Sequence, residues 1–107
     1  MIDDYQETME LLAKMRSSLP IPAYPSKELA ALLREQKLKI KTSQRLEIVN
    51  MHYLGDEGGI ACALELPSRA KEVYVVSLTH LRIMPPHPLA MDIRRYQLHR
   101  IRNLAQQ

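Results

Sequence analysis

The chain has few aromatic residues and a single cysteine. Among its 107 residues there is no Phe and no Trp, so five Tyr are the only aromatic side chains and the core must be largely aliphatic. One cysteine, Cys62, excludes an intramolecular disulfide and a zinc site made of cysteines alone. The chain has no apolar run of about 18 residues and begins with the acidic segment MIDD, so we expect a cytoplasmic protein without a signal peptide or spanning helix.

The overall composition is that of an ordinary globular domain. Hydrophobic residues make up 46% of the chain and charged residues 25%, with a formal net charge of +3. A chain of this length has one core, which predicts a single domain over residues 1–107. Neither GxGxxG nor GxxxxGK occurs, so we expect no phosphate-binding glycine loop and no cofactor.

The sequence from Leu46 to Leu66 has the pattern of a β-hairpin. Two runs rich in β-branched, aromatic and aliphatic residues, LEIVNMHYL and IACALEL, flank the turn GDEGG. Antiparallel pairing keeps the sum of the paired residue numbers constant, so one contact across the turn sets all the others. With Leu54 opposite Ile60, the remaining pairs are His52 with Cys62, Asn50 with Leu64 and Ile48 with Leu66.

Two helices are predicted in the first third of the chain. Asp4 begins a sequence that resembles a capping box, and apolar residues then recur at helical spacing, which predicts a helix over about 4–17. Ser26 is a suitable N-cap for a second helix over about 26–36. The prolines of LPIPAYP, between these helices, predict an extended connector.

The later segments have a different periodicity. Residues 37–42 alternate Lys with aliphatic residues, which favours a short edge strand, and continuation of the second helix is the alternative. The stretch 72–83 is apolar on both faces at its start and is predicted to be the central strand. Pro88 suits the first position of a last helix over 88–104.

These elements predict an α+β fold, because the order contains no βαβ alternation that would indicate a parallel sheet. We expect an antiparallel sheet of three to four strands, packed with two N-terminal helices and one C-terminal helix. The sheet would consist of the hairpin 46–66, the strand 72–83 and the edge strand 37–42.

One face of this sheet lacks a predicted cover. Val49, Met51 and Tyr53 point away from the face that the helices would cover, and a domain this small has few elements left to shield them. We therefore expect these three residues to bind a second copy or another protein.

A metal site is one alternative interpretation of the same hairpin. On the register above, His52 and Cys62 are cross-strand neighbours, and His80 joins them if the third strand lies alongside. Three nitrogen or sulfur ligands with an open position are typical of a catalytic zinc site. A shift of the register by one residue would separate these side chains.

A phosphate-binding surface is the other alternative. Arg95, His99 and Arg102 fall on the exposed face of the predicted last helix at steps of four and three residues. A second basic stripe consists of Lys37, Lys39 and Lys41. Cations in such rows can contact the phosphates of a nucleic acid.

The sequence thus favours a small, non-enzymatic binding or assembly module, a homo-oligomer that associates through its sheet. A nucleic-acid-binding accessory protein and a small metalloenzyme with a His/Cys site are the two alternatives. We expect no membrane contact.

Overall fold

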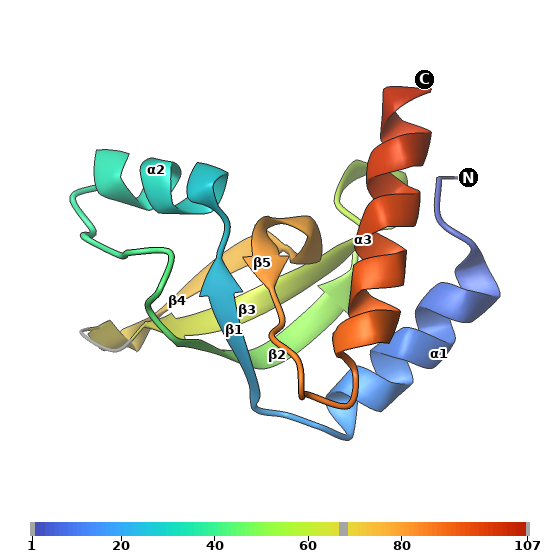
Figure 1. Ribbon diagram of the computed structural model, residues 1–107, viewed down its shortest axis with the longest axis horizontal. Helices are drawn as coiled ribbons and strands as arrows, with labels where there is room; N and C mark the ends of the chain where they lie inside the picture. The colour runs from blue at the N-terminus through green and yellow to red at the C-terminus, as the bar shows by residue number, and fades with distance from the viewer. Residues whose placement is uncertain (1, 67–68, 107) are drawn as a thin grey trace.

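The computed structural model describes residues 2–66 and 69–106, with residues 69–72 described by their backbone alone (Figure 1). The described residues form the expected α+β fold, but the antiparallel sheet has five strands, in the order β4-β3-β2-β1-β5. The elements along the chain are α1 (Tyr5–Arg16), β1 (Ile21–Pro25), α2 (Lys27–Glu35), β2 (Leu46–Tyr53), the 3-10 turn η1 (Gly55–Glu57), β3 (Ile60–Leu66), β4 (Arg69–Ser77), the 3-10 turn η2 (Leu78–His80), β5 (Leu81–Arg82) and α3 (Ala90–Ala105).

The helices lie at two ends of the curled sheet. α1 and α3 contact each other at the end of the molecule where both chain termini lie, and there α1 also contacts β2 and α3 also contacts η2 (Figure 1). At the opposite end, α2 packs against β1 (Figure 1). The core between these helices and the inner face of the sheet is mainly aliphatic. Its largest completely buried side chains are Met15, Ile21, Pro25, Leu46, Ile48, Met51, Ile60, Leu64, Leu66, Leu78, Leu81 and Ile93.

The first two helices begin where the sequence predicts. The Oδ1 atom of Asp4 accepts a hydrogen bond from the Glu7 N–H at 2.9 Å. Likewise, the hydroxyl of Ser26 accepts from the Leu29 N–H at 3.1 Å. Each cap satisfies a backbone donor that has no partner within the helix.

The last helix begins two residues later than predicted. Pro88 lies in a turn, because the ring nitrogen Nδ1 of His87 accepts the Leu89 N–H at 3.0 Å. α3 therefore starts at Ala90 and continues to Ala105.

Residues 37–42 form neither the predicted edge strand nor a continued helix. Lys37 adopts a φ of 65°, which stops α2, and the Leu38 N–H then donates to the Leu33 carbonyl at 2.9 Å. Leu38 and Ile40 are buried, whereas the lysines between them are exposed. The alternation predicts which side chains face the core, but the segment is a loop.

The proline-rich connector is extended as predicted, but it is a strand within the sheet. Residues 21–23 of β1 pair with β2, and residues 24–25 pair with β5. Each half of β1 thus pairs with a strand on one side only. A proline has no N–H to donate, and a strand with a partner on one side tolerates this because its other side requires no hydrogen bonds.

The hairpin register differs from the predicted one. Leu54 leaves the strand, its N–H donating to the Gly59 carbonyl at 2.8 Å, and the first pair beyond the turn is therefore Tyr53 with Ile60. His52 pairs with Ala61, and Met51 pairs with Cys62. A bulge at Val49 shifts the register once more, which places Met51 in the core together with Ile48 and Leu46.

The predicted strand 72–83 is two strands at opposite edges of the sheet. β4 ends at Ser77, whose hydroxyl accepts from the Thr79 N–H at 3.4 Å and starts η2. β5 then pairs with β1, so β4 is an edge strand, not the central one. Val73 and Val75 of β4 are accordingly 57% and 65% exposed.

Replacement of Gly59 should strain the hairpin turn more than replacement of Gly55. Both glycines have a positive φ, which costs about 1–2 kcal/mol for a residue with a Cβ. A Cβ at Gly59 would also overlap the Tyr96 hydroxyl and the Arg100 guanidinium, whereas one at Gly55 meets nothing within 4 Å. We expect Gly59→Ala to lose about 1–3 kcal/mol more than Gly55→Ala in urea unfolding. Equal losses would contradict this packing.

Candidate functional site

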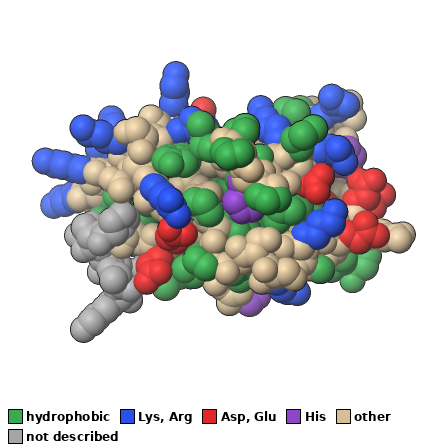
Figure 2. Space-filling model, turned by 60° about the horizontal axis from the view of Figure 1, so that its bottom comes forward, with side chains coloured by type: hydrophobic (Ala, Val, Ile, Leu, Met, Phe, Trp, Pro, Cys, Tyr) green, Lys and Arg blue, Asp and Glu red, His purple; other side chains and the backbone are tan. Residues whose placement is uncertain are grey.

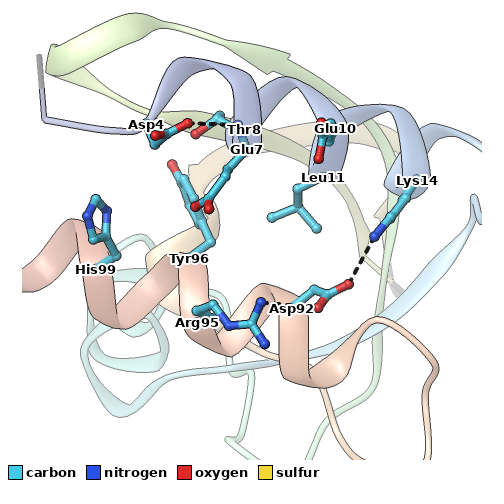
Figure 3. A pocket seen from close by; sticks show the side chains of 10 residues that line it. All are labelled: Asp4, Glu7, Thr8, Glu10, Leu11, Lys14, Asp92, Arg95, Tyr96 and His99. Carbon is cyan, nitrogen blue, oxygen red and sulfur yellow. Dashed lines mark hydrogen bonds and ion pairs between the residues drawn. The ribbon is translucent and has the colours of Figure 1, made fainter.

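A cavity of ≈ 250 Å³ opens between α1 and α3 (Figure 3). Its lining residues come from both helices and from the segment that precedes α1. They are Asp4, Glu7, Thr8, Glu10, Leu11, Lys14, Asp92, Arg95, Tyr96 and His99.

The charges in this α1–α3 cavity are mixed, with an excess of carboxylates. At one end Asp92 lies between two cations, 3.4 Å from Lys14 and 3.9 Å from Arg95 (Figure 3). Asp4 and Glu7 lie at the other end, near His99 (Figure 3). Four carboxylates against one lysine and one arginine favour a cationic ligand over a phosphate.

Tyr96 joins this cavity to the hairpin. Its hydroxyl oxygen accepts a hydrogen bond from the buried N–H of Ile60 at 2.9 Å. Burial raises the pKa of Tyr96 to about 12, and the N–H of Ile60 opposes this only in part. The phenol is therefore neutral at physiological pH.

A buried ion pair lies next to Tyr96. Arg100 Nη1 is 2.9 Å from Asp3 Oδ2, and the two side chains are only 3% and 1% exposed. Arg100 Nη2 also donates to the carbonyl of Asp56 at 2.7 Å, and the Tyr53 hydroxyl donates to Asp3 at 3.0 Å. These bonds tie the segment before α1, the turn η1 and the helix α3 together.

Two further hydrogen bonds hold the chain segment around Asp3. The N–H of Ile2 donates to the side chain of Asp56 at 2.9 Å, and Asn103 donates to the carbonyl of Ile2 at 2.7 Å. Asp3 Oδ1 is buried and has no hydrogen-bond partner among the described residues. The sequence pattern did not identify this network, although an arginine beside the apolar face of a helix is a signal that a buried counterion exists.

The candidate metal ligands do not converge. Cys62 is buried in the core opposite Met51, whereas His52 is exposed and points to the other face of the sheet. His80 lies in η2, after the end of β4. Within the described part of the chain, no three His, Cys, Asp or Glu side chains are placed to hold a metal ion.

The three predicted partner-binding residues also lie in different environments. Met51 is completely buried, so the prediction that it faces a partner is wrong. Tyr53 is half-buried, and its hydroxyl is bonded to Asp3. Val49 is half-buried at the bulge of β2.

The two predicted basic stripes lie at opposite ends of the molecule. Arg95 and His99 line the α1–α3 cavity beside its carboxylates, and Arg102 is exposed two turns further along α3. Lys37, Lys39 and Lys41 are exposed in the loop after α2, at the other end (Figure 1). On the face seen in Figure 2, Lys and Arg side chains project from the outer part of that end, whereas Lys, Arg, Asp and Glu lie side by side at the α1–α3 end. The two stripes therefore do not form one phosphate-binding surface.

Comparisons with known proteins return no match: no family model fits the chain, and no curated protein and no solved structure is similar to it. Among the described residues, no helix is both long enough and apolar enough to cross a membrane.

Loss of the Arg100 guanidinium should destabilise the fold strongly. Arg100→Met leaves the Asp3 carboxylate buried without a counterion, which costs about 3–5 kcal/mol. Lys14→Met, which breaks the exposed pair with Asp92, should cost at most about 1 kcal/mol in the same urea unfolding experiment. The double variant Asp3→Asn, Arg100→Met should be more stable than Arg100→Met alone. A single-variant loss as small as that of Lys14→Met would contradict a buried pair.

The free energy of unfolding should fall as the pH rises above about 9. Burial raises the pKa of the Cys62 thiol from 9.0 to about 12, and burial with the hydrogen bond to Asp3 raises that of Tyr53 from 10.0 to about 12. Above pH 9 the unfolded chain therefore loses protons that the folded chain keeps, which favours unfolding. Urea titrations from pH 8 to pH 11 check this, and Cys62→Ala should flatten the first part of the decline. A constant free energy over this range would contradict it.

Proposed function

We propose that the protein is a binding or assembly module that pairs with a second copy of itself through the edge strand β4. The supporting observation is the exposure of Val73 and Val75, at 57% and 65%, on the second half of this edge strand. Exposed apolar residues on an edge strand favour pairing with another chain.

The backbone of β4 supports a second copy as the occupant. Among the strands of the described chain, β4 pairs only with β3, so no strand of this sheet covers its outer edge, where a further strand can be added. Two copies of β4 related by a twofold axis would run antiparallel and offer each other the same groups. The charged residues of β4, Arg69, Lys71 and Glu72, lie in its first half, whereas Val73–Ser77 contains no Lys, Glu or Pro that would oppose pairing.

The neighbouring side chains confine the apolar surface to this edge. Ala63 of β3 lies beside Val75, and Asn50 of β2 follows on the same face of the sheet. A partner that covered the whole face of the sheet would need apolar side chains across it, but small and polar residues lie at these positions. We therefore propose that two copies pair through the β4 edge and not through Val49, Met51 and Tyr53.

Light scattering at low micromolar concentration tests the proposal. We expect twice the chain mass of 12.4 kDa for the unaltered protein and the mass of one chain for Val75→Lys, because a lysine on an edge strand opposes pairing with another chain. Val75 is mostly exposed, so circular dichroism should show an intact fold. Leu98→Lys, an equally polar change at an exposed leucine of α3, is the matched control and should leave the dimer intact.

A monomer at all concentrations would contradict the proposal. A dimer that Leu98→Lys disrupts and Val75→Lys does not would also contradict it, because association would then occur through α3.

A further inference from the structure

A second cavity, of ≈ 350 Å³, lies between the beginning of α2, β5 and the N-terminal part of α3. Three cations from these three elements line it, Lys27, Arg82 and Arg94, against the single carboxylate of Glu28. β5 is at the opposite edge of the sheet from β4, so this α2–β5 cavity is separate from the proposed pairing edge.

Arg82 is held in this cavity by neutral acceptors. Its Nε donates to the Pro25 carbonyl at 3.4 Å, and its Nη2 donates to the Thr42 carbonyl at 2.6 Å. A guanidinium has five N–H donors, so three remain for a ligand. Because both acceptors are carbonyls, the positive charge of Arg82 is not neutralised.

Arg94 is oriented by a buried amide. Gln97 donates from Nε2 to the carbonyls of Leu78 and Leu81, at 2.7 and 2.6 Å, which fixes its side chain. The opposite amide atom, Oε1, then accepts a hydrogen bond from Arg94 Nη1 at 3.4 Å. Arg94 therefore also keeps its full charge and most of its donors.

The three cations differ from the basic residues of the α1–α3 cavity. Within the described residues, none of Lys27, Arg82 and Arg94 forms an ion pair with a carboxylate, whereas Arg95 and Lys14 both pair with Asp92. Unpaired cations that converge on one cavity create a positive potential there.

We propose that the α2–β5 cavity binds the phosphate group of a small phosphorylated molecule. Arginine donors match phosphate oxygens in pairs, and the hydroxyls of Ser26, Thr42 and Thr79 line the same cavity and can donate further hydrogen bonds. The volume lies near the lower end of the range of about 300–1,000 Å³ for ligand cavities, which suits a phosphate with a small organic group. Glu28 faces the ligand as the one opposing charge.

Titrations of ¹⁵N-labelled protein with inorganic phosphate and with glycerol phosphate, at constant ionic strength, test this site by NMR. We expect shifts at residues 26–28 and 79–82 with both probes, and tighter binding of glycerol phosphate than of inorganic phosphate because the cavity also takes the organic group. Arg94→Gln should weaken binding about tenfold or more, as for other hydrogen bonds to a charged group. Thr79→Val, which leaves the charge unchanged, should weaken it less.

The matched control is Arg102→Gln, which removes the same charge from an exposed position of α3 outside the cavity. It should leave the affinity unchanged. An equal loss for Arg102→Gln, or the absence of shifts at millimolar phosphate, would overturn the proposal. Acetate binding as tightly as phosphate would also overturn it, because the site would then select a carboxylate.

Discussion

The ion pair between Asp3 and Arg100 is the interaction on which the α1–α3 end of the molecule depends. A buried charge without a partner costs several kcal/mol, so neither residue can occupy its position without the other. The pair fixes the position of α3 against the segment before α1. That position in turn places Tyr96 over the hairpin turn, where only a glycine at residue 59 leaves room for its hydroxyl.

The sheet has a second constraint of this kind in its strand β1. This strand joins the hairpin on one side to β5 on the other, and β5 leads into α3. Gln97 then holds α3 to η2 through the Leu78 carbonyl and to β5 through the Leu81 carbonyl. The helices are thus attached to the sheet by directed polar bonds at its ends, while aliphatic side chains fill the interior between them.

The parts of the fold that sequence patterns predict correctly are those that depend on near neighbours. Asp4 and Ser26 cap helices that begin one residue later, so their effect can be recognised in a short stretch of sequence. The fold class and the two runs of the hairpin follow from local periodicity in the same way. The exposure of Arg95 and His99 on α3 follows from helical spacing alone.

The parts that the sequence did not predict depend on partners far away along the chain. The register of the hairpin changes with the hydrogen bonds of its turn, and the bulge at Val49 reverses which residues face the core. The register set by the turn separates His52 from Cys62, and the bulge places Met51 on the same face as Ile48 and Leu46. Similarly, the carboxylates beside Arg95 and His99 come from α1, from the residue that precedes it and from the first turn of α3, so the negative excess of the cavity is visible only when the two helices are packed.

The sequence separation of Asp3 and Arg100 has a consequence for the synthesis of the protein. The two residues are 97 positions apart, so the ribosome makes Arg100 roughly 5–20 s after Asp3 at typical rates of translation. During this time the hairpin can form from neighbouring residues, but the acidic N-terminal segment has no buried position to occupy. The segment around Asp3 can therefore take its buried position only after α3 has been made.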